Sequence, residues 1–416
     1  MVEWKNAPDL STPLDADHLT QAFDDERATE RAYQSSTYGP KVPAYAAPRL
    51  GTYDVGKCLY NWHPGNTRKW RNALAAARAG TGFARLNCYG DSITQGSGLG
   101  NPAPIHSGSW PDRLRTKFDA TYGAAGTGVI YLTADGDDTR AVFNANGGSA
   151  WDAYQGFAAY GAWGAYSPSY TVGAWFEVGP VTCDSFTIHT FGTVGAGPLV
   201  VSIDGGATTN YPNTRTPNGP LAIVVPAGAL GAHTIKVAIG AGGLIIVQGV
   251  EATIGTAGVR VTRWGKSSAT ADWLVEGQSA VSGDVTDGSL PFSFDLFPPN
   301  LSIIAFGENE FLTNVPVATY KTNMQTIITK AKNFGDVLLA TATPNVSTTA
   351  TPSQASYAAA LYDLADTNDV ALLDLNDRWQ TFAASSTLYA DGVTHPNTAG
   401  YFDIAEAVYQ AIGTAV

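Results

Sequence analysis

Apolar runs and helical patterns alternate in two separate stretches of the chain, residues 49–134 and 261–416. In the second stretch, short continuous apolar runs alternate with segments whose apolar positions are three or four residues apart. In the first, a partly alternating run at residues 83–89 follows one such segment. Continuous apolar runs are typical of parallel strands buried on both faces, with helices covering those faces. The predicted strands are residues 83–89, 301–306, 337–342 and 370–375, and the predicted helices are residues 66–79, 316–332, 353–365 and 398–412.

The intervening stretch, residues 135–260, has a different pattern. Charged residues become scarce, and Gly, Pro and Asp turn signals separate short apolar runs. Closely spaced short strands joined by such turns favour a β-sandwich. We therefore predict an α/β domain interrupted by an inserted β-sandwich. The strands predicted for the sandwich are residues 174–178, 185–190, 199–203, 221–225, 234–239 and 244–253.

Residues 1–48 are predicted to form an N-terminal arm. Prolines punctuate this segment, and between them residues 15–33 carry apolar positions at helical spacing, among them Leu19 and Phe23. The pattern predicts one amphipathic helix with a narrow apolar stripe. One interpretation is a helix packed on the body of the protein. The other is an element for attachment or oligomerisation.

The overall composition favours a globular protein and disfavours a nucleic-acid partner. Of 416 residues, 44% are hydrophobic and 14% charged, so the chain can bury a core for two or three domains. The formal net charge is -12, and the sequence contains no basic stripe. Nucleic-acid binding depends on neutralising phosphates with Lys and Arg, which this balance does not supply.

The cysteines and the apolar runs exclude several other classes. Cys58, Cys88 and Cys183 lack the paired spacing of a zinc motif or a disulfide framework. No apolar run reaches the roughly 20 residues of a membrane span. The first residues, Met1 to Pro8, contain neither a basic nor an apolar signal region, so no secretory signal is expected.

The segment Gly90-Asp91-Ser92-Ile93-Thr94 contains the first candidate for chemistry. It follows the predicted strand 83–89, and a tight turn after a strand aims a side chain rigidly. Free N–H groups in such a turn can bind an oxyanion, and a serine hydroxyl becomes a nucleophile when a base takes its proton. Ser92 is therefore a candidate nucleophile. The alternative is an ordinary Asp-Ser turn.

A second candidate precedes the last predicted helix, in Asp391-Gly392-Val393-Thr394-His395-Pro396. A histidine can act as the base, and a carboxylate can fix its tautomer and stabilise the imidazolium. His395 and Asp391 are therefore candidates for these two roles. The alternative is a surface histidine beside a helix cap.

Two further segments offer hydrogen-bond donors. Gly307-Glu308-Asn309-Glu310 follows the predicted strand 301–306, where ligand groups gather in open parallel sheets, and the amide of Asn309 can donate to an oxyanion. Trp264-Gly265-Lys266-Ser267-Ser268 precedes a helix start and offers free backbone N–H groups. The alternatives are a polar turn and a plain helix cap.

These four segments together resemble the SGNH hydrolases, also called the GDSL esterases. The segment around Ser92 is similar to the family's nucleophile block, that around Asn309 to its oxyanion block, and Asp391 to Pro396 to its terminal acid and His-Pro block. The resemblance covers residues 83–130 and 260–416. It implies a flavodoxin-like three-layer α/β/α fold. It also implies ester hydrolysis, often of acetyl groups on carbohydrates, without a metal or other cofactor.

The chain departs from the family pattern at two positions. The family usually places its acid three residues before the histidine, whereas Asp391 is four before His395. The second oxyanion block usually reads Gly-x-Ser-Gly, and Ser268 stands at the second glycine. The resemblance implies that Ser92 attacks the carbonyl and His395 moves the proton. The N–H groups of Ser92 and Ser268 and the side chain of Asn309 would then hold the oxyanion.

The N-terminal segment Trp4 to Leu19 resembles the starts of actinobacteriophage minor tail proteins, and so does Tyr60 to Arg71. This resemblance implies a virion tail enzyme that acts outside the cell on a host envelope glycan. It also implies a homotrimer or tail-protein partners bound through the arm. A cytoplasmic or non-classically released enzyme is the alternative location.

Aromatic residues near the start of the predicted sandwich have two interpretations. They could stack on sugar faces as part of a carbohydrate-binding module, or they could fill the junction between domains. The residues are Trp151, Tyr154, Tyr160, Trp163, Tyr166 and Tyr170.

Three functions are thus compared. The first is a carbohydrate esterase or deacetylase on a phage tail. The second is a bacterial acetylxylan- or lipase-like esterase of the same family. The third is a structural or glycan-binding tail protein with a degenerate site, to which the departures at Asp391 and Ser268 would point.

Overall fold

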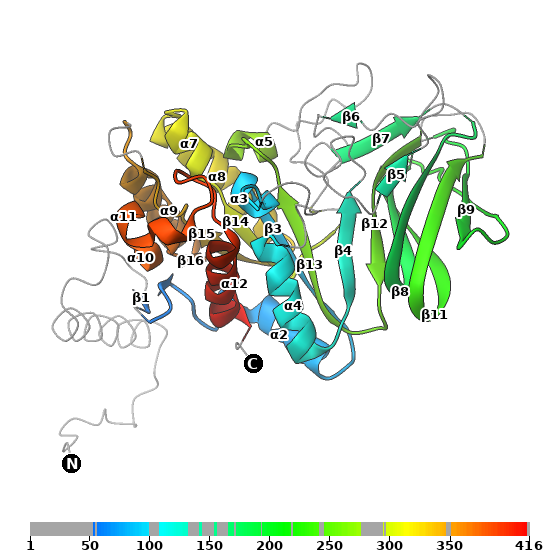
Figure 1. Cartoon of the computed structure of the whole chain (residues 1–416), viewed down its shortest axis with the longest axis horizontal. Helices are drawn as coiled ribbons and strands as arrows, with labels where there is room; N and C mark the ends of the chain where they lie inside the picture. Colours follow the sequence, from blue (N-terminus) through cyan, green and yellow to red (C-terminus); the bar gives the residue numbers. More distant parts are fainter. Residues whose placement is uncertain are drawn as a thin grey trace, which may run out of the picture.

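The computed structural model describes residues 53–54, 56–99, 108–131, 141–143, 154–155, 165–169, 172–192, 194–217, 219–240, 245–275, 294, 297–346 and 351–413. The arm predicted for residues 1–48 lies outside them. Within the described part, a parallel sheet lies between helices, and an antiparallel sheet stands beside it (Figure 1). Among these residues, no helix has both the length and the apolar character needed to cross a bilayer.

The parallel sheet has the strand order of a doubly wound fold. Along the sheet the described parallel strands lie in the order β13-β3-β14-β15-β16, which is 2-1-3-4-5 in chain order, as in flavodoxin. The short strands β2 (Leu59–Tyr60) and β1 (Tyr53–Asp54) extend it antiparallel beyond β16. The parallel strands are β3 (Phe83–Gly90), β13 (Gly258–Gly265), β14 (Leu301–Ala305), β15 (Asp336–Ala340) and β16 (Ala371–Leu373).

Both faces of this sheet are buried, because successive side chains of a strand point to opposite faces. In β15, Val337 and Leu339 join one hydrophobic core, and Leu338 and Ala340 join the other. This three-layer arrangement agrees with the prediction from continuous apolar runs. The first core is covered by α5 (Ala271–Val275), α8 (Val317–Lys332) and α9 (Gln354–Asn368), and the second by α2 (Arg68–Arg78), α4 (Trp110–Tyr122) and α12 (Thr398–Ile412).

Short helices lie in the segments that follow the parallel strands β3, β14 and β16. The nucleophile candidate lies in one of them and the oxyanion candidate Asn309 in another. These short helices are α3 (Ser92–Gln95), α7 (Glu308–Leu312), α10 (Leu375–Trp379), α11 (Phe382–Ser385) and the 3-10 helix η3 (Ser386–Leu388).

The antiparallel sheet is built around two long strands, β8 (Trp175–Gly192) and β11 (Gly219–Ile239). They pair along most of their length, with a bulge between Pro226 and Gly231. This sheet has a hydrophobic core of its own. The described strands form one hydrogen-bonded sheet, so a two-sheet sandwich stays a prediction. The other strands are β4 (Gly126–Tyr131), β5 (Ala141–Phe143), β6 (Tyr154–Gln155), β7 (Ala165–Ser169), β9 (Leu199–Ile203), β10 (Thr209–Tyr211) and β12 (Ile245–Thr253).

Strand pairing moves both predicted boundaries of the insertion. Strand β4, assigned to the α/β domain by the boundary at residue 135, pairs with β12 of the antiparallel sheet. Strand β13, which the boundary at residue 260 divides, pairs in parallel with β3 over its whole length. By pairing, the antiparallel unit therefore begins near residue 126 and ends near residue 253.

A buried ion-pair cluster joins the two sheets. Glu251 on β12 is fully buried and accepts two hydrogen bonds from the guanidinium of Arg85 on β3, at 3.1 and 3.2 Å. Arg260 on β13 lies 3.4 Å from the same carboxylate and stacks over the ring of Phe83. Burial alone would raise the pKa of Glu251, but Arg85, His189 and Arg260 hold it well below its usual range. The carboxylate therefore stays charged inside the interface between the sheets.

We predict that Glu251→Gln lowers the free energy of unfolding by about 3 kcal/mol, because removing one partner leaves buried guanidinium charge uncompensated. Chemical denaturation of wild type and variant measures the difference. Glu177→Gln on the neighbouring strand β8 is the matched control, since Glu177 is only half-buried. Equal stability of the two variants would contradict the assigned role of the cluster.

Candidate active site

Ser92 is held in a tight turn at the carboxyl end of β3. Asp91 is the N-cap of α3, and its Oδ1 accepts a hydrogen bond of 2.9 Å from the N–H of Ile93. Such a cap satisfies one of the free donors that begin a helix. Ser92 is the first residue of α3 and is 5% exposed. Its own N–H therefore has no acceptor within the helix.

Two glycines let this turn lie directly on the sheet. A Cβ on Gly265, the last residue of β13, would overlap the main chain of Thr94 and Gln95. A Cβ on Gly90 would lie 2.7 Å from the carbonyl oxygen of Ala305 on β14. Only residues without side chains permit this close approach. The position of Ser92 is thus fixed by main-chain contact with the neighbouring strands.

The loop before α12 brings His395 to Ser92. The Nε2 of His395 lies 3.0 Å from the Oγ of Ser92, and its Nδ1 lies 2.6 Å from the Oδ2 of Asp391. The three side chains form one continuous hydrogen-bonded series. This geometry lets an imidazole take a proton from a hydroxyl while a carboxylate holds the ring.

Asp391 reaches His395 despite the extra residue between them. Its Oδ1 accepts hydrogen bonds from the N–H groups of Val393, Thr394 and His395 at 2.9, 2.8 and 3.1 Å. The chain turns around the carboxylate, and Gly392 adopts a positive φ of 67° within that turn. Burial alone would raise the pKa of Asp391, but these backbone hydrogen bonds and His395 lower it to about 2. The carboxylate is therefore ionised at neutral pH.

The predicted oxyanion donors gather beside the same turn. Lys266 N donates to the carbonyl of Gly90 at 3.1 Å, which ties the segment after β13 to the end of β3. Asn309, in the first turn of α7, donates through Nδ2 to the carbonyl of Ala269 at 2.9 Å. An amide NH₂ has two hydrogens, so Asn309 keeps a second one to donate. Ser92, Ser268 and Asn309 thus come from the neighbouring strand ends of β3, β13 and β14.

Ser268 has a left-handed backbone, with φ of 61°. This conformation explains a preference for glycine at the position, because a Cβ in the left-handed region costs about 1–2 kcal/mol. The serine adopts the glycine-like conformation instead of changing the turn. The departure noted in the sequence therefore leaves the path of the main chain compatible with the predicted role.

Three carboxyl groups are buried close to the turn. Burial raises the pKa of Glu308 to about 8, that of Glu310 to about 7 and that of Asp91 to about 6. The hydrogen bond from Ile93 and the charge of His395 act to lower the pKa of Asp91, but burial has the larger effect and raises it. A substantial part of this cluster is protonated at neutral pH. The charge of this cluster, close to the site, therefore changes with pH around neutrality.

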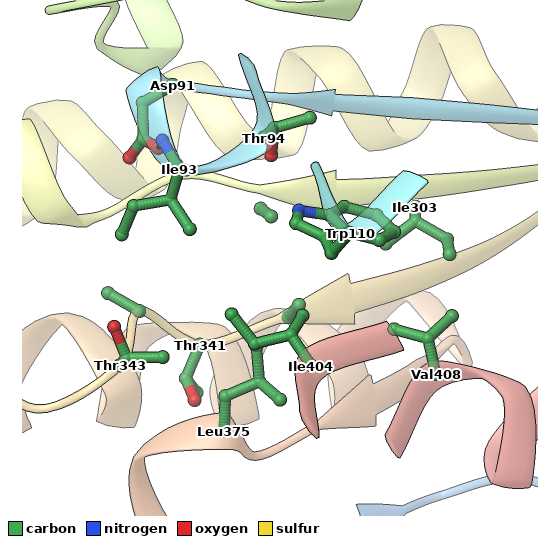
Figure 2. Close-up of a pocket in the computed structure, with 13 residues that line it drawn as sticks. Asp91, Ile93, Thr94, Trp110, Ile303, Thr341, Thr343, Leu375, Ile404 and Val408 are labelled. Carbon is green, nitrogen blue, oxygen red and sulfur yellow. Dashed lines mark hydrogen bonds between the residues drawn. The ribbon is translucent and has the colours of Figure 1, made fainter. Parts of the chain in front are cut away.

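A small cavity lies behind the Ser92 turn, on the face of the sheet covered by α12. Figure 2 shows Asp91, Ile93 and Thr94 on one side and Thr341, Thr343 and Leu375 on the other. Its volume of about 30 Å³ suits roughly one water molecule. The cavity is too small for an acylated sugar, so it is not the substrate site.

Several contributors to the site were not singled out from the sequence. Asn345, which follows β15, donates to both Glu308 and Thr394. The sequence marks Asn345 only as a polar residue just beyond a buried strand, and many ordinary turns have such a residue. Gly98 also contributes, because it leaves room for His395: a Cβ at position 98 would lie 2.7 Å from the Cβ of His395. The aromatic residues predicted for sugar stacking have no described side chains.

The fold and a family match together support an ester hydrolase. Residues 246–401 match the model described as the GDSL-like Lipase/Acylhydrolase family. The matched segment contains Ser268, Asn309, Asp391 and His395, while Ser92 lies before the insertion and outside the match. No curated protein matched the sequence.

The fold is similar to that of one solved esterase among three compared structures. A peptidoglycan O-acetylesterase superposes with a TM-score of 0.61 at 15% identity, covering 86% of this chain and 99% of the other. A family two carbohydrate esterase from Cellvibrio japonicus has a TM-score of 0.26 at 12% identity, covering 70% and 99%. An enzyme of the same family from Corynascus thermopiles, with a carbohydrate binding domain, has a TM-score of 0.27 at 16% identity. The match covers 66% of this chain and 99% of the other. Only the first score is high enough to show a shared fold.

The left-handed backbone at residue 268 generates a first prediction. We expect Ser268→Gly to keep esterase activity and to change the free energy of unfolding by less than about 1 kcal/mol, since strain is relieved while the unfolded chain gains freedom. Ser268→Val should lower both, because a β-branched residue tolerates positive φ poorly. Urea denaturation and an ester assay compare the two. A valine variant equal to the glycine variant would contradict the left-handed conformation.

The buried carboxyls generate a second prediction. A carboxyl whose pKa is higher in the folded than in the unfolded chain binds more protons when folded, so its stabilising contribution is lost as pH rises. For Glu308 the window runs from the ordinary value of 4.5 to about 8. We expect the melting temperature to fall across this window and to fall less steeply in Glu308→Gln. Calorimetry at several pH values checks it, and parallel curves would contradict it.

Proposed function

We propose that the protein is a serine esterase that removes acetyl groups from an acylated carbohydrate. The observation that carries this proposal is the hydrogen-bonded series Asp391–His395–Ser92 at the carboxyl edge of the parallel sheet. Ligands of doubly wound folds bind at this edge, where the strand order reverses. Here the reversal falls between β3 and β14, the strands that precede Ser92 and Asn309.

In the proposed mechanism, Ser92 Oγ attacks the ester carbonyl while His395 Nε2 accepts the hydroxyl proton. His395 then gives that proton to the leaving alkoxide, and the alcohol departs from the acyl-enzyme. Water attacks the acyl-enzyme with His395 again as the base, and Ser92 is regenerated. Asp391, ionised and bonded to Nδ1, stabilises the imidazolium throughout.

The oxyanion is assigned to three donors: the N–H of Ser92, the N–H of Ser268 and the side chain of Asn309. Each belongs to a short segment at the end of a buried strand, which supports an assignment to donors that are fixed before substrate binds. Preorganised donors stabilise developing charge without reorganisation, and losing one typically costs about 10²–10³ in rate.

A carbohydrate acetyl ester is the proposed substrate because the fold is similar to that of a peptidoglycan O-acetylesterase and the family match is to acylhydrolases. The virion tail as the location and a host envelope glycan as the target are proposed from the resemblance of residues 4–19, which lie outside the described residues, and of residues 60–71. The stacking of sugars on the inserted unit is likewise a proposal from its aromatic composition.

We predict that Ser92→Ala lowers hydrolysis of p-nitrophenyl acetate by about 10⁴-fold or more, because a single nucleophile starts the reaction. Ser97→Ala is the matched control in the same turn, since the described bonds of Ser97 are made by its main chain. Circular dichroism verifies that both variants are folded. Acetylated glycans are then screened with wild type and Ser92→Ala.

Covalent labelling separates this proposal from the non-catalytic alternative. A fluorophosphonate should label wild type at Ser92 and leave Ser92→Ala unlabelled. Full activity of folded Ser92→Ala, or an unlabelled and inert wild type, would refute the esterase. The second outcome would favour a structural or glycan-binding protein.

A further inference from the structure

A buried set of polar side chains lies behind the Asp391–His395 loop and takes no part in the proposed chemistry. Asn345 Nδ2 donates to Glu308 Oε1 at 2.5 Å and to Thr394 Oγ1 at 2.9 Å. Glu308 begins α7 after β14, Asn345 follows β15, and Thr394 immediately precedes His395. The set therefore connects two strand ends of the sheet to the loop that carries the histidine.

All three side chains are removed from solvent, with exposures of 2% for Glu308, 6% for Asn345 and 8% for Thr394. Gln354 holds the set from the other side, because its Nε2 donates to Glu308 Oε2 at 3.2 Å and its Oε1 accepts from Asn345 N at 3.1 Å. Leaving a buried polar group unpaired is costly. The set therefore resists rearrangement.

Thr394 is the point at which this set meets the proposed catalytic residues. Its hydroxyl accepts from Asn345, and its backbone N–H donates to Asp391 Oδ1 at 2.8 Å. The loop also closes on itself, since Ala390 N donates to the carbonyl of His395 at 2.8 Å. That internal bond sets the shape of the loop. The bond from Asn345 instead ties the loop to the end of the sheet.

Resting on the proposed esterase function, we propose that Glu308 is a positioning residue. Through Asn345 and Thr394, it holds the Asp391–His395 loop at hydrogen-bond distance from Ser92. Glu308 touches no reacting atom in this assignment. Its effect is on the distance between base and nucleophile, where displacement by about 1 Å can cost 10²-fold in rate.

The charged surroundings of Glu308 give a readout that a purely structural role would lack. The titratable groups that face it are carboxyls: Asp91 after β3, Glu310 on α7 and Asp391 in the loop. Tyr389, which begins the loop, also feels its charge. Ionising Glu308 adds repulsion toward these carboxyls and strengthens the bond that it accepts from Asn345. The kcat should therefore change with pH around the pKa of Glu308, about 8.

The experiment compares kcat and KM for p-nitrophenyl acetate in wild type, Thr394→Val, Glu308→Ala and Glu308→Gln. Thr394→Val keeps the volume and removes the acceptor, and Thr326→Val on the exposed side of α8 is the matched control. We expect kcat to fall about 10-fold or more in Thr394→Val and Glu308→Ala, with KM within about twofold. Glu308→Gln should retain more activity than Glu308→Ala, and the change of kcat around pH 8 should be absent from it.

Non-additivity is the second expectation. The double variant Thr394→Val/Glu308→Ala should lose little more than either single variant, because both break one chain of contacts. Hydrogen exchange of residues 389–397 should be faster in each single variant than in Thr326→Val. This measurement requires no catalysis.

The outcomes separate this proposal from the one on which it rests. An inert wild type with unlabelled Ser92 would overturn the esterase. An active wild type with unchanged kcat and loop exchange in Thr394→Val would overturn the positioning role alone, and so would a change confined to KM. If Glu308→Ala fails to fold, Thr394→Val and Glu308→Gln decide the question.

Discussion

Helix α3 lies directly on the main chain of Gly265, and this contact couples the two halves of the α/β domain. Gly90 and Gly265 end adjacent parallel strands, and neither position tolerates a Cβ. The residue between strand and helix, Asp91, then caps α3 and leaves Ser92 at its start. The orientation of Ser92 depends on β13, a strand that the chain reaches only after the whole insertion.

The insertion must therefore return the chain to the edge of β3 in register. Strand β12 carries Glu251 into the space between the sheets, where Arg85 of β3 and Arg260 of β13 meet it. Buried charges are costly unless paired, so a shift in register would leave charges without partners. The cluster thus specifies the alignment that the backbone contact at Gly265 requires. It lies toward the start of β3, while Ser92 follows its carboxyl end.

The sequence predicted elements whose apolar pattern is regular along their own length. Strand β9 and helix α12 have the predicted bounds, and the apolar run at 301–306 ends one residue from β14. Strand β13 was not assigned to the parallel sheet, because Arg260, Thr262 and Arg263 interrupt its apolar pattern. Arg260 is buried all the same, since Glu251 and the ring of Phe83 accommodate its guanidinium. Such compensation comes from distant residues and leaves no local signal.

The long strands show a related limit of local patterns. Residues 221–225 and 234–239 were predicted as separate strands, because Pro226-Ala227-Gly228 is typical of a turn. In the structure both belong to β11, and the register shifts between Pro226 and Gly231. A bulge accommodates the proline and glycine without ending the strand. Whether such a segment turns or bulges depends on the partner strand, here β8.

At the candidate site, residue types and strand ends were predictable, but contacts across the sheet were not. The spacing of Asp391 from His395 differs from the family pattern by one residue, yet the carboxylate reaches the imidazole. One oxygen gathers three backbone N–H groups, and the other remains for the ring. The requirement is therefore a turn wrapped around the carboxylate, and the longer spacing of this chain forms such a turn. The place of that turn relative to Ser92 is a separate requirement, and we propose that Asn345, in the segment after β15, meets it through its bond to Thr394.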